Sequence, residues 1–297
     1  MDAAELRVFE AVARLGGMVR AGAELNMVQS NVTARVRQLE ARLGVALFTR
    51  HPRGVEPTAA GRRLLPYARR VARLLEDARR AVLDDGTPQG ALVIGSLETT
   101  AALRLCPVLT GFVAACPAVD LTLRTGTSCE MLARVLAQEL EGAFVCGPVS
   151  HPDLEVEPIC TEELVLLSAA GVRGLDALAR GGCQVRIVVL RAGCSYRQRL
   201  EDLLARRGVP APRVLEFGTL EAIFASVSAG LGVSLLPRAL VGPVVSRGRL
   251  AVHRLPARDA TVETVFVRRR DAHRSSALSA FLDRVRAPAT AAPMAAE

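Results

Sequence analysis

The spacing of hydrophobic residues near the start of the chain is that of a helix. Apolar side chains recur every three or four positions over residues 5–15, and two glycines end the pattern. The same spacing returns over residues 19–25 and 29–43, with a tight turn at residues 26–27 between them. We therefore expect three short helices, the last two joined as in a helix-turn-helix.

The next segment predicts a small hairpin and then a long helix. Residues 46–50 and 54–57 are typical of two short strands, which would form a wing. Thr58 is a good N-cap, and apolar spacing then continues to about residue 85. A helix this long with a narrow apolar stripe cannot bury the stripe alone, so we expect a coiled coil with a second copy; packing on the chain's own core is the alternative. The expected seam residues are Leu64, Val71, Leu74 and Leu75.

After a linker at residues 86–90 the pattern changes to alternating strands and helices. Strands are expected at residues 91–95, 119–124, 142–146, 154–159, 164–168, 185–189, 213–216, 233–236, 250–255 and 262–269. Helices are expected at residues 99–115, 128–138, 195–207, 220–229 and 275–286. This alternation predicts doubly wound α/β sheets, and the number of strands favours two lobes over one.

These patterns divide the chain into segments. We expect the winged helix-turn-helix at 1–57, the linker helix and hinge at 58–90, a first lobe at 91–160 plus 263–287, a second lobe at 161–262, and a low-complexity, disordered tail at 288–297.

Charge is concentrated near the start of the chain. The net charge is +8, and residues 20–73, with eleven arginines against three acidic residues, account for all of it. A basic segment beside a neutral remainder points to a polyanionic partner, although a solvated helix face is an alternative. No apolar run reaches the ~18 residues of a membrane helix, and the first residues do not resemble a signal peptide. We therefore expect a cytoplasmic protein without a membrane partner.

The residue types present argue against catalysis. All 38 Lys and Arg positions are arginine, which excludes a P-loop lysine and a Schiff-base lysine. The seven cysteines are irregularly spaced and form no C-x-x-C, so neither a disulfide framework nor a zinc site is expected. The sequence lacks H-E-x-x-H and G-x-S-x-G, and Gly230-Leu231-Gly232 lacks the third glycine of a dinucleotide loop. We expect no enzyme, no metal and no cofactor.

Residues 21–65 carry an extended motif, AGAELNMVQSNVTARVRQLEARLGVALFTRHPRGVEPTAAGRRLL. It resembles the helix-turn-helix of LysR-type transcriptional regulators. The matching positions are Ala21, Leu25, Gln29, Val32, Val36, Arg37, Leu39, Glu40, Leu43, Gly44, Leu47, Phe48, Arg50, Gly54, Val55, Thr58, Ala60 and Gly61. The resemblance is tight over about 85 residues; the remainder fits in length and element order. It implies an α/β fold: a winged helix-turn-helix, a linker helix and a two-lobed doubly wound effector domain like a periplasmic binding protein.

The resemblance implies double-stranded DNA, RNA polymerase and further copies of the chain, as dimer or tetramer, as partners. A helix fits the major groove, where amides read adenine and arginine reads guanine. The residues expected at base edges are Gln29, Ser30, Asn31, Thr33 and Arg35. The residues expected at phosphates are Arg37, Arg50, His51, Arg53 and Arg62.

Three positions depart from the family pattern. Val28 replaces the Ser or Thr that caps the recognition helix, so another group must satisfy its first amides. Gly22 replaces Ala, which should weaken the second helix by up to ~1 kcal/mol. Where the family often has Ser-Arg-Gln, this chain has Thr33-Ala34-Arg35, so the arginine lies one position later. The displacement puts base readout at that position in question.

Four expected helix starts in the second half are rich in Ser and Thr. In doubly wound sheets ligands bind beyond the carboxyl ends of the strands, where free amides favour anions. The resemblance implies an effector between two lobes, so we expect one cleft for a small polar molecule that carries a carboxylate; ordinary helix capping is the alternative. The expected residues are Ser96, Thr99, Thr100, Thr125, Thr127, Ser195, Gly218 and Thr219. Glu98 and Glu216 argue against a purely anionic ligand.

Two other functions are considered. Cys194 lies at an expected helix start, where a thiolate is stabilised, and Cys183 is nearby in sequence. A redox-responsive regulator is therefore one alternative. A solute-binding protein or an enzyme, with the first domain serving only assembly, is another; the basic segment argues against it.

Overall fold

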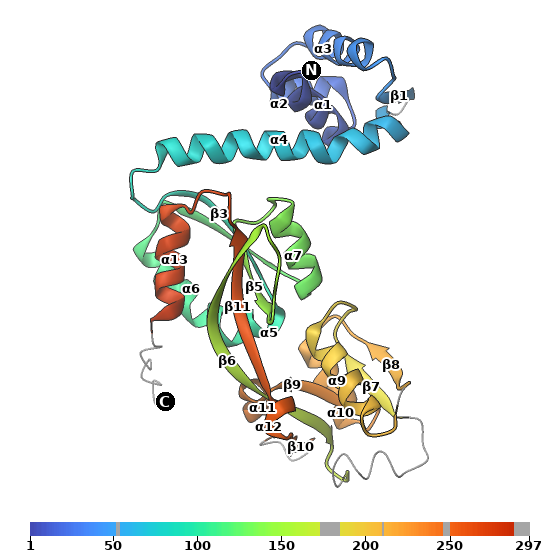
Figure 1. Ribbon diagram of the computed structural model, residues 1–297, viewed down its shortest axis with the longest axis vertical. Helices are drawn as coiled ribbons and strands as arrows, with labels where there is room; N and C mark the ends of the chain where they lie inside the picture. Colours follow the sequence, from blue (N-terminus) through green and yellow to red (C-terminus); the bar gives the residue numbers. More distant parts are fainter. Residues whose placement is uncertain (52–53, 173–184, 210, 246–249, 288–297) are drawn as a thin grey trace. The chain divides into compact units, whose positions relative to one another are not determined.

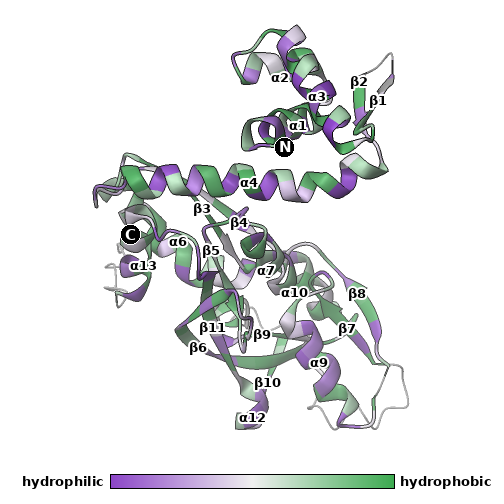
Figure 2. Cartoon of the chain, turned by 45° about the horizontal axis from the view of Figure 1, so that its top comes forward, coloured by the Kyte–Doolittle hydropathy of each residue, from purple (hydrophilic) through white to green (hydrophobic). Residues whose placement is uncertain are grey.

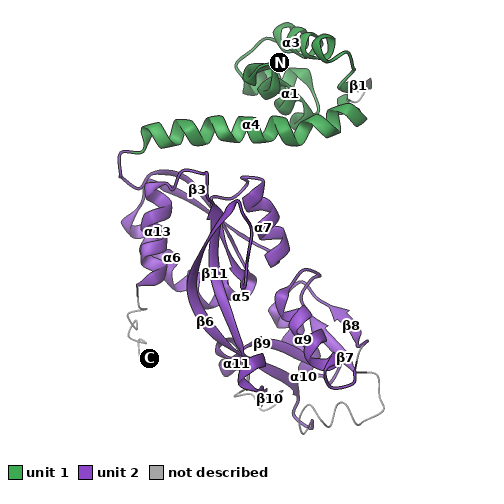
Figure 3. Cartoon of the chain, in the orientation of Figure 1, with its two compact units in different colours: residues 1–84 green, residues 85–297 purple. Residues whose placement is uncertain are grey.

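The computed structural model describes residues 1–51, 54–172, 185–209, 211–245 and 250–287. They form two compact units, residues 1–84 and residues 85–297 (Figure 3). The expected disordered tail lies outside the described residues.

Unit 1 begins with the three expected helices, α1 (Ala3–Leu15), α2 (Met18–Glu24) and α3 (Gln29–Leu43) (Figure 1). Local chemistry sets their ends. The Asp2 side chain accepts from the Glu5 amide and Glu5 accepts in return, which forms a capping box. Gly16 and Gly44 end α1 and α3 in the left-handed conformation that glycine adopts without strain. The inward faces meet in one core around Phe9, which is fully buried.

The close turn between α2 and α3 explains why position 22 is a glycine, although glycine has a low helix propensity. A Cβ at Gly22 would lie 2.5 Å from the Met27 carbonyl oxygen. The Met27 amide donates to the Gly22 carbonyl at 2.8 Å, so the two backbones meet at the turn between α2 and α3. Glycine therefore permits the close turn of the motif, and the expected weakening of α2 is only part of its effect.

The wing is the hairpin of β1 (Phe48–His51) and β2 (Gly54–Pro57). β1 begins two residues later than expected because Glu40 holds the preceding turn. Its Oε1 atom accepts from the amides of Leu47 at 2.7 Å and Phe48 at 3.2 Å. The Val55 amide donates to the Gly16 carbonyl at 3.1 Å, which fixes the wing to the end of α1.

The long helix α4 (Ala59–Leu83) forms as expected, with Thr58 accepting from the Gly61 amide at 3.1 Å. Hydrophobic and polar residues alternate along it in Figure 2. The expected seam is divided, however. Leu64 and Val71 pack on the core of unit 1, whereas Leu74 and Leu75 are half exposed. The alternative of packing on the chain's own core therefore holds for the first half of α4.

Unit 2 contains a mixed sheet in the order β10-β6-β11-β5-β3-β4, with β9 also paired to β6. We call lobe 1 the part built on β3 (Gly90–Ser96), β4 (Val119–Thr125), β5 (Gly142–Cys146), β11 (Thr261–Arg269) and the first half of β6. β3 pairs in parallel with β4 and β5, and β11 runs antiparallel between β5 and β6.

One expectation in this sheet is wrong. Residues 154–159 and 164–168 were expected as two strands, but β6 (Leu154–Ala169) is a single strand. Its first part pairs with β11, and its second part pairs with β9 and β10. The polar residues between the two apolar stretches suggest a break, yet they lie where the strand passes from one lobe to the other.

We call lobe 2 the part built on the second half of β6, β9 (Ser234–Pro237), β10 (Leu250–Arg254), β7 (Arg186–Val189) and β8 (Arg213–Glu216). β7 and β8 are parallel, and an isolated bridge between Ile187 and Val233 joins them to β9.

Helices cover both faces of each lobe, which confirms the doubly wound expectation. In lobe 1, α6 (Cys106–Ala115) and α13 (Ser276–Arg286) pack on one face and α7 (Ser128–Leu136) on the other. In lobe 2, α9 (Ser195–Ala205) packs on one face, and α10 (Leu220–Ser228) and α11 (Arg238–Val245) on the other.

The helices differ from expectation at three places. The expected helix over 99–115 is α5 (Glu98–Thr100), a π-helical segment η1 (Ala101–Leu105) and then α6. Two helices were missed, α11 and α12 (Ala257–Ala260). Both are short and contain or follow proline, which masks their periodicity. Among the described residues, the helices include none that is long and apolar enough to cross a membrane.

Candidate nucleic-acid interface and ligand pocket

The outer face of α3 presents polar side chains. Val32, Val36 and Leu39 are buried beneath it, so the intervening positions must point outward. Of the residues expected at base edges, Thr33 is half-buried; the exposed ones are Gln29, Ser30, Asn31 and Arg35. Arg37, expected at a phosphate, is also exposed.

The start of α3 is open to an anion. Among the described residues no side chain caps it: Val28 occupies the cap with extended backbone, and its side chain offers no acceptor. Arg35 and Arg37 make no hydrogen bond or ion pair to another described residue. Free amides at the start of a helix together with unpaired guanidinium groups suit phosphate oxygens.

The wing and α4 supply the remaining expected phosphate contacts. His51 is exposed at the end of β1, and the Nη1 atom of Arg62 donates to the Pro57 carbonyl at 2.7 Å. Arg53 lies outside the described residues, and the structure describes only the backbone of Arg50.

A pocket lies in unit 2 between the two lobes, with a cavity volume of about 130 Å³. That volume exceeds the ~10–15 Å³ of probe space that one water needs, so a small molecule can enter. Residues from all four of the expected helix starts line the pocket. Lobe 1 supplies the residues Leu97, Glu98, Thr99, Thr125, Gly126, Thr127 and Glu130. Lobe 2 supplies the residues Leu190, Arg191, Cys194, Ser195, Tyr196 and Gly218.

Three residues expected in the pocket lie outside its lining. Ser96 is fully buried and donates to the Leu97 carbonyl. Thr100 is also fully buried, and its Oγ1 atom has no hydrogen-bond partner within the described part of the chain. Thr219 caps α10 by accepting from the Ala222 amide at 3.3 Å. Capping, the alternative reading of these helix starts, is therefore the observed role of Thr219.

A polar network connects the pocket to the long strand of the sheet. Thr99 Oγ1 lies 3.3 Å from the Tyr196 hydroxyl, which donates to Glu162 Oε2 at 3.4 Å. Glu162 is on β6, and Arg104 Nε lies 3.9 Å from its other oxygen. Burial raises the pKa of Glu162, which Arg104 and Tyr196 only partly oppose. Burial also raises the pKa of Tyr196, so its hydroxyl stays protonated and available as a donor.

Charged residues in the pocket were missed as site residues. Glu98 was predicted only to disfavour an anionic ligand, and Arg191 was not predicted, although it lies four residues before the third expected helix. Burial raises the pKa of Glu98, and the charge of Arg191 acts against this shift. Glu130 is occupied, because it accepts from the Thr127 amide at 2.9 Å.

Burial disfavours the thiolate form of two cysteines at the junction of the lobes, Cys194 and Cys146. Burial raises the pKa of Cys194 despite its place at the start of α9, and it does the same for Cys146. Raised pKa values lower the thiolate fraction, contrary to our expectation for Cys194. Cys183 lies outside the described residues. No group of metal-ligating side chains occurs in the part of the chain that the structure describes.

Comparison with known proteins gives the same division of the chain. Residues 3–62 match the bacterial regulatory helix-turn-helix protein, lysR family. Residues 85–289 match the LysR substrate binding domain.

Three similar proteins extend over nearly the whole chain. The uncharacterized HTH-type transcriptional regulator YusT of Bacillus subtilis is 44% identical over 284 residues, 95% of each chain. The HTH-type transcriptional regulator GltR of the same organism is 41% identical over 281 residues, again 95% of each. Full-length CbnR, solved in complex with its target DNA, is 25% identical with a TM-score of 0.63, covering 96% of this chain and 99% of CbnR. The helix-turn-helix, the two lobes and these matches show that the chain belongs to the LysR family of transcriptional regulators.

Proposed function

We propose that α3 is the recognition helix and enters the major groove of an operator. Its exposed Gln29, Asn31 and Arg35 would contact base edges, while Arg37 and the wing would contact phosphates. The observation that carries this proposal is the exposed polar face of α3, with Arg35 and Arg37 unpaired among the described residues, above a buried apolar face. The structure of CbnR with its target DNA supports it by likeness.

The pocket between the lobes is the proposed effector site. Thr99, Thr125, Thr127, Ser195 and Gly218 line it and support this proposal. A ligand that contacts both lobes can change their separation and so alter the spacing of recognition helices in an oligomer. The family and the relatives are transcriptional regulators, so we assign no enzymatic activity to the pocket.

The proposed oligomer forms through the second half of α4, where Leu74 and Leu75 are exposed. In this scheme residues 1–57 bind DNA, residues 58–90 associate, and residues 91–160 with 263–287 and residues 161–262 form the two effector lobes. RNA polymerase at the adjacent promoter is the proposed downstream partner. The proposed location is the cytoplasm, because the DNA that the protein would bind lies there.

The DNA-binding proposal is tested by anisotropy on two labelled duplexes, the fragment upstream of the protein's own gene and a shuffled fragment of equal length. Arg37→Ala removes a phosphate contact, so it should weaken binding to both and reduce the salt slope by about one unit. Arg35→Ala should weaken binding to the upstream fragment alone, since base contacts carry the sequence information.

Arg124→Ala is the matched control. Arg124 is an exposed arginine on β4 in unit 2, and it also makes no hydrogen bond or ion pair to another described residue. It should leave affinity and salt slope at wild-type values. Equal effects of Arg37→Ala and Arg124→Ala would show that α3 is not the bound surface.

A further inference from the structure

The pocket presents one carboxylate and one guanidinium, from opposite lobes, that make no hydrogen bond to another described residue. Glu98 opens α5 in lobe 1, and Arg191 precedes α9 in lobe 2. The guanidinium lies over the loop before α10, since a Cβ on Gly218 would be 3.5 Å from Arg191 Nη2. Neither side chain makes a hydrogen bond or ion pair to another described residue. Two opposite charges therefore line the same cavity without being paired.

The Glu98 carboxylate is partly removed from water, and no described residue donates a hydrogen bond to it. Its partial burial raises its pKa; the charge of Arg191 acts against this shift, and the nearby charge of Glu221 adds to it. A partly buried carboxylate without a partner is unfavourable, so a cationic group that enters the pocket gains from restoring its hydrogen bonds. An ammonium group, with three donors and a full charge, meets this need.

Arg191 can bind an anionic group of the same ligand. Its guanidinium presents a planar set of donors that fits a carboxylate in a bidentate manner. Thr127 and Ser195 line the same cavity. Thr127 Oγ1 accepts from the Glu130 amide and can still donate its proton. Ser195 Oγ donates to Ser128 Oγ and can still accept. A dianion is disfavoured, because Glu98 and Glu130 outnumber Arg191 among the charged lining residues. The site thus suits a ligand that carries both charges.

The size and the remaining lining limit the ligand further. The cavity of about 130 Å³ admits a small molecule, and Leu97 and Leu190 supply its apolar walls. We propose that the pocket binds a small zwitterionic amino acid, with its ammonium group on Glu98 and its carboxylate on Arg191. This inference rests on the proposed effector site and refines the carboxylate expected from the sequence. The ligand would link the two lobes through charges that lack partners in its absence.

The test uses the full-length protein and measures melting temperature and calorimetric affinity. The probes are the twenty L-amino acids, and for each that binds, its decarboxylated amine and its 2-keto acid. We expect at least one amino acid to stabilise the protein and to bind about tenfold or more tightly than either derivative, since each derivative leaves one charged residue unpaired.

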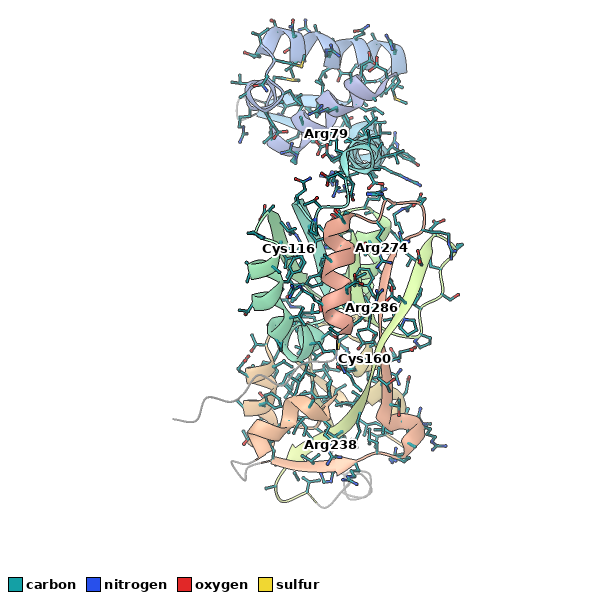
Figure 4. All side chains as sticks on the ribbon, turned by 90° about the vertical axis from the view of Figure 1, so that its left-hand side faces the viewer. Arg79, Cys116, Cys160, Arg238, Arg274 and Arg286 are labelled. Atoms are coloured by element: carbon teal, nitrogen blue, oxygen red, sulfur yellow. The ribbon has the colours of Figure 1, made fainter. Side chains whose placement is uncertain are left out.

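Two neutralising variants separate the charges. Glu98→Gln should weaken amino-acid binding about tenfold and improve the relative binding of the 2-keto acid; Arg191→Gln should do the reverse with the amine. The controls are Glu163→Gln and Arg238→Gln, which neutralise an exposed pair with an Nη1 to Oε2 distance of 3.1 Å outside the pocket. Arg238 lies on lobe 2 in Figure 4. Both controls should bind like the wild type.

Three outcomes overturn the inference: no amino acid binds, the 2-keto acid binds as tightly as the amino acid, or the controls weaken binding as much as the pocket variants. DNA binding is measured on the same preparations. Intact binding to the upstream fragment with any of these outcomes rejects the ligand class and leaves the DNA-binding proposal standing. Loss of DNA binding by the wild type rejects the proposed function separately.

Discussion

Single residues in this chain are held by backbone contacts that the sequence only hints at. Gly61 is an example: a Cβ there would lie 2.2 Å from the Leu47 carbonyl oxygen. That oxygen already accepts from the Thr58 amide at 2.9 Å, so it cannot easily move. The glycine of the family motif thus allows α4 to begin directly against the turn that leads to the wing.

Gly61→Ala should therefore destabilise unit 1 by about 1–3 kcal/mol, because a methyl group is forced into a packed backbone contact. For a unit of this size that corresponds to a fall of roughly 4–8 °C in melting temperature per kcal/mol. Circular dichroism of the full chain measures it. Gly171→Ala is the control, because a Cβ there meets nothing within 4 Å. A Gly61→Ala variant that melts like the wild type would contradict the close contact.

Cys194 offers a second test at the residue scale. Because burial raises its pKa, less of it is thiolate at pH 8 than an exposed cysteine would provide. We expect iodoacetamide to alkylate Cys106 and Cys129, which are exposed, well before Cys194. Peptide mass spectrometry over a time course reports each rate. Faster modification of Cys194 than of Cys129 would reverse the assignment and revive the redox alternative.

At the scale of elements, α4 divides into a half that packs on its own unit and a half that does not. Leu64 and Val71 belong to the core of unit 1, so charge there would unfold the unit rather than report on association. Leu74 and Val82 are 54% and 84% exposed and make better probes. The proposed coiled coil would bury both.

The double variant Leu74→Glu with Val82→Glu should lower the mass of the assembly in sedimentation velocity, since buried unpaired carboxylates oppose a helix seam. Unit 1 should stay folded, because neither residue contributes to its core. Val19→Glu is the control: Val19 is 63% exposed on α2, away from α4. An unchanged mass at equal protein concentration would reject α4 as the interface.

Periodicity predicted most elements of both units correctly, because their apolar faces are long enough to show a period. α3 begins and ends at the predicted residues, Gln29 and Leu43. Hydrophobic periodicity failed where the position of a segment in the tertiary structure outweighs its local pattern. β6 crosses from one lobe to the other, so its middle is polar although it is a strand. α11 and α12 are too short for a period to emerge.

The sequence predicted a cleft lined by Ser and Thr residues, but it predicted only some of the residues that line the pocket. Ser and Thr at helix starts indicated where the chain would gather free polar groups, and Thr99, Thr127 and Ser195 do meet there. Whether a given hydroxyl enters the cavity or caps a helix depends on the orientation of each helix, which no local pattern encodes. Glu98 and Arg191 suggest a zwitterionic ligand only when they line the same pocket, and they are 93 residues apart in sequence.

At the scale of the whole molecule, the network of Thr99, Tyr196, Glu162 and Arg104 lies where lobe 1, lobe 2 and β6 meet. Thr99 and Tyr196 line the pocket, and Glu162 belongs to the strand shared by both lobes. Glu162 is only 8% exposed, so its charge costs stability that Arg104, at 3.9 Å, does not fully restore.

The sign of the pH dependence follows from the raised pKa of Glu162. An acid whose pKa is higher in the folded state binds more protons folded than unfolded, so the free energy of unfolding decreases as pH rises. The decrease begins near the ordinary Glu value of about 4.3 and is complete above the raised pKa. Glu162→Gln keeps the side-chain shape and an acceptor for Tyr196 while it removes this titration.

We therefore expect the melting temperature of wild type minus that of Glu162→Gln to become more negative as pH is raised from 4.5 to 8. Taking the difference cancels the titration of all other groups. Glu163→Gln, the exposed neighbour on the same strand, controls for loss of one negative charge. A difference that is flat with pH, or that rises, would mean that Glu162 is not a desolvated carboxylate and that the junction between the lobes is held in another way.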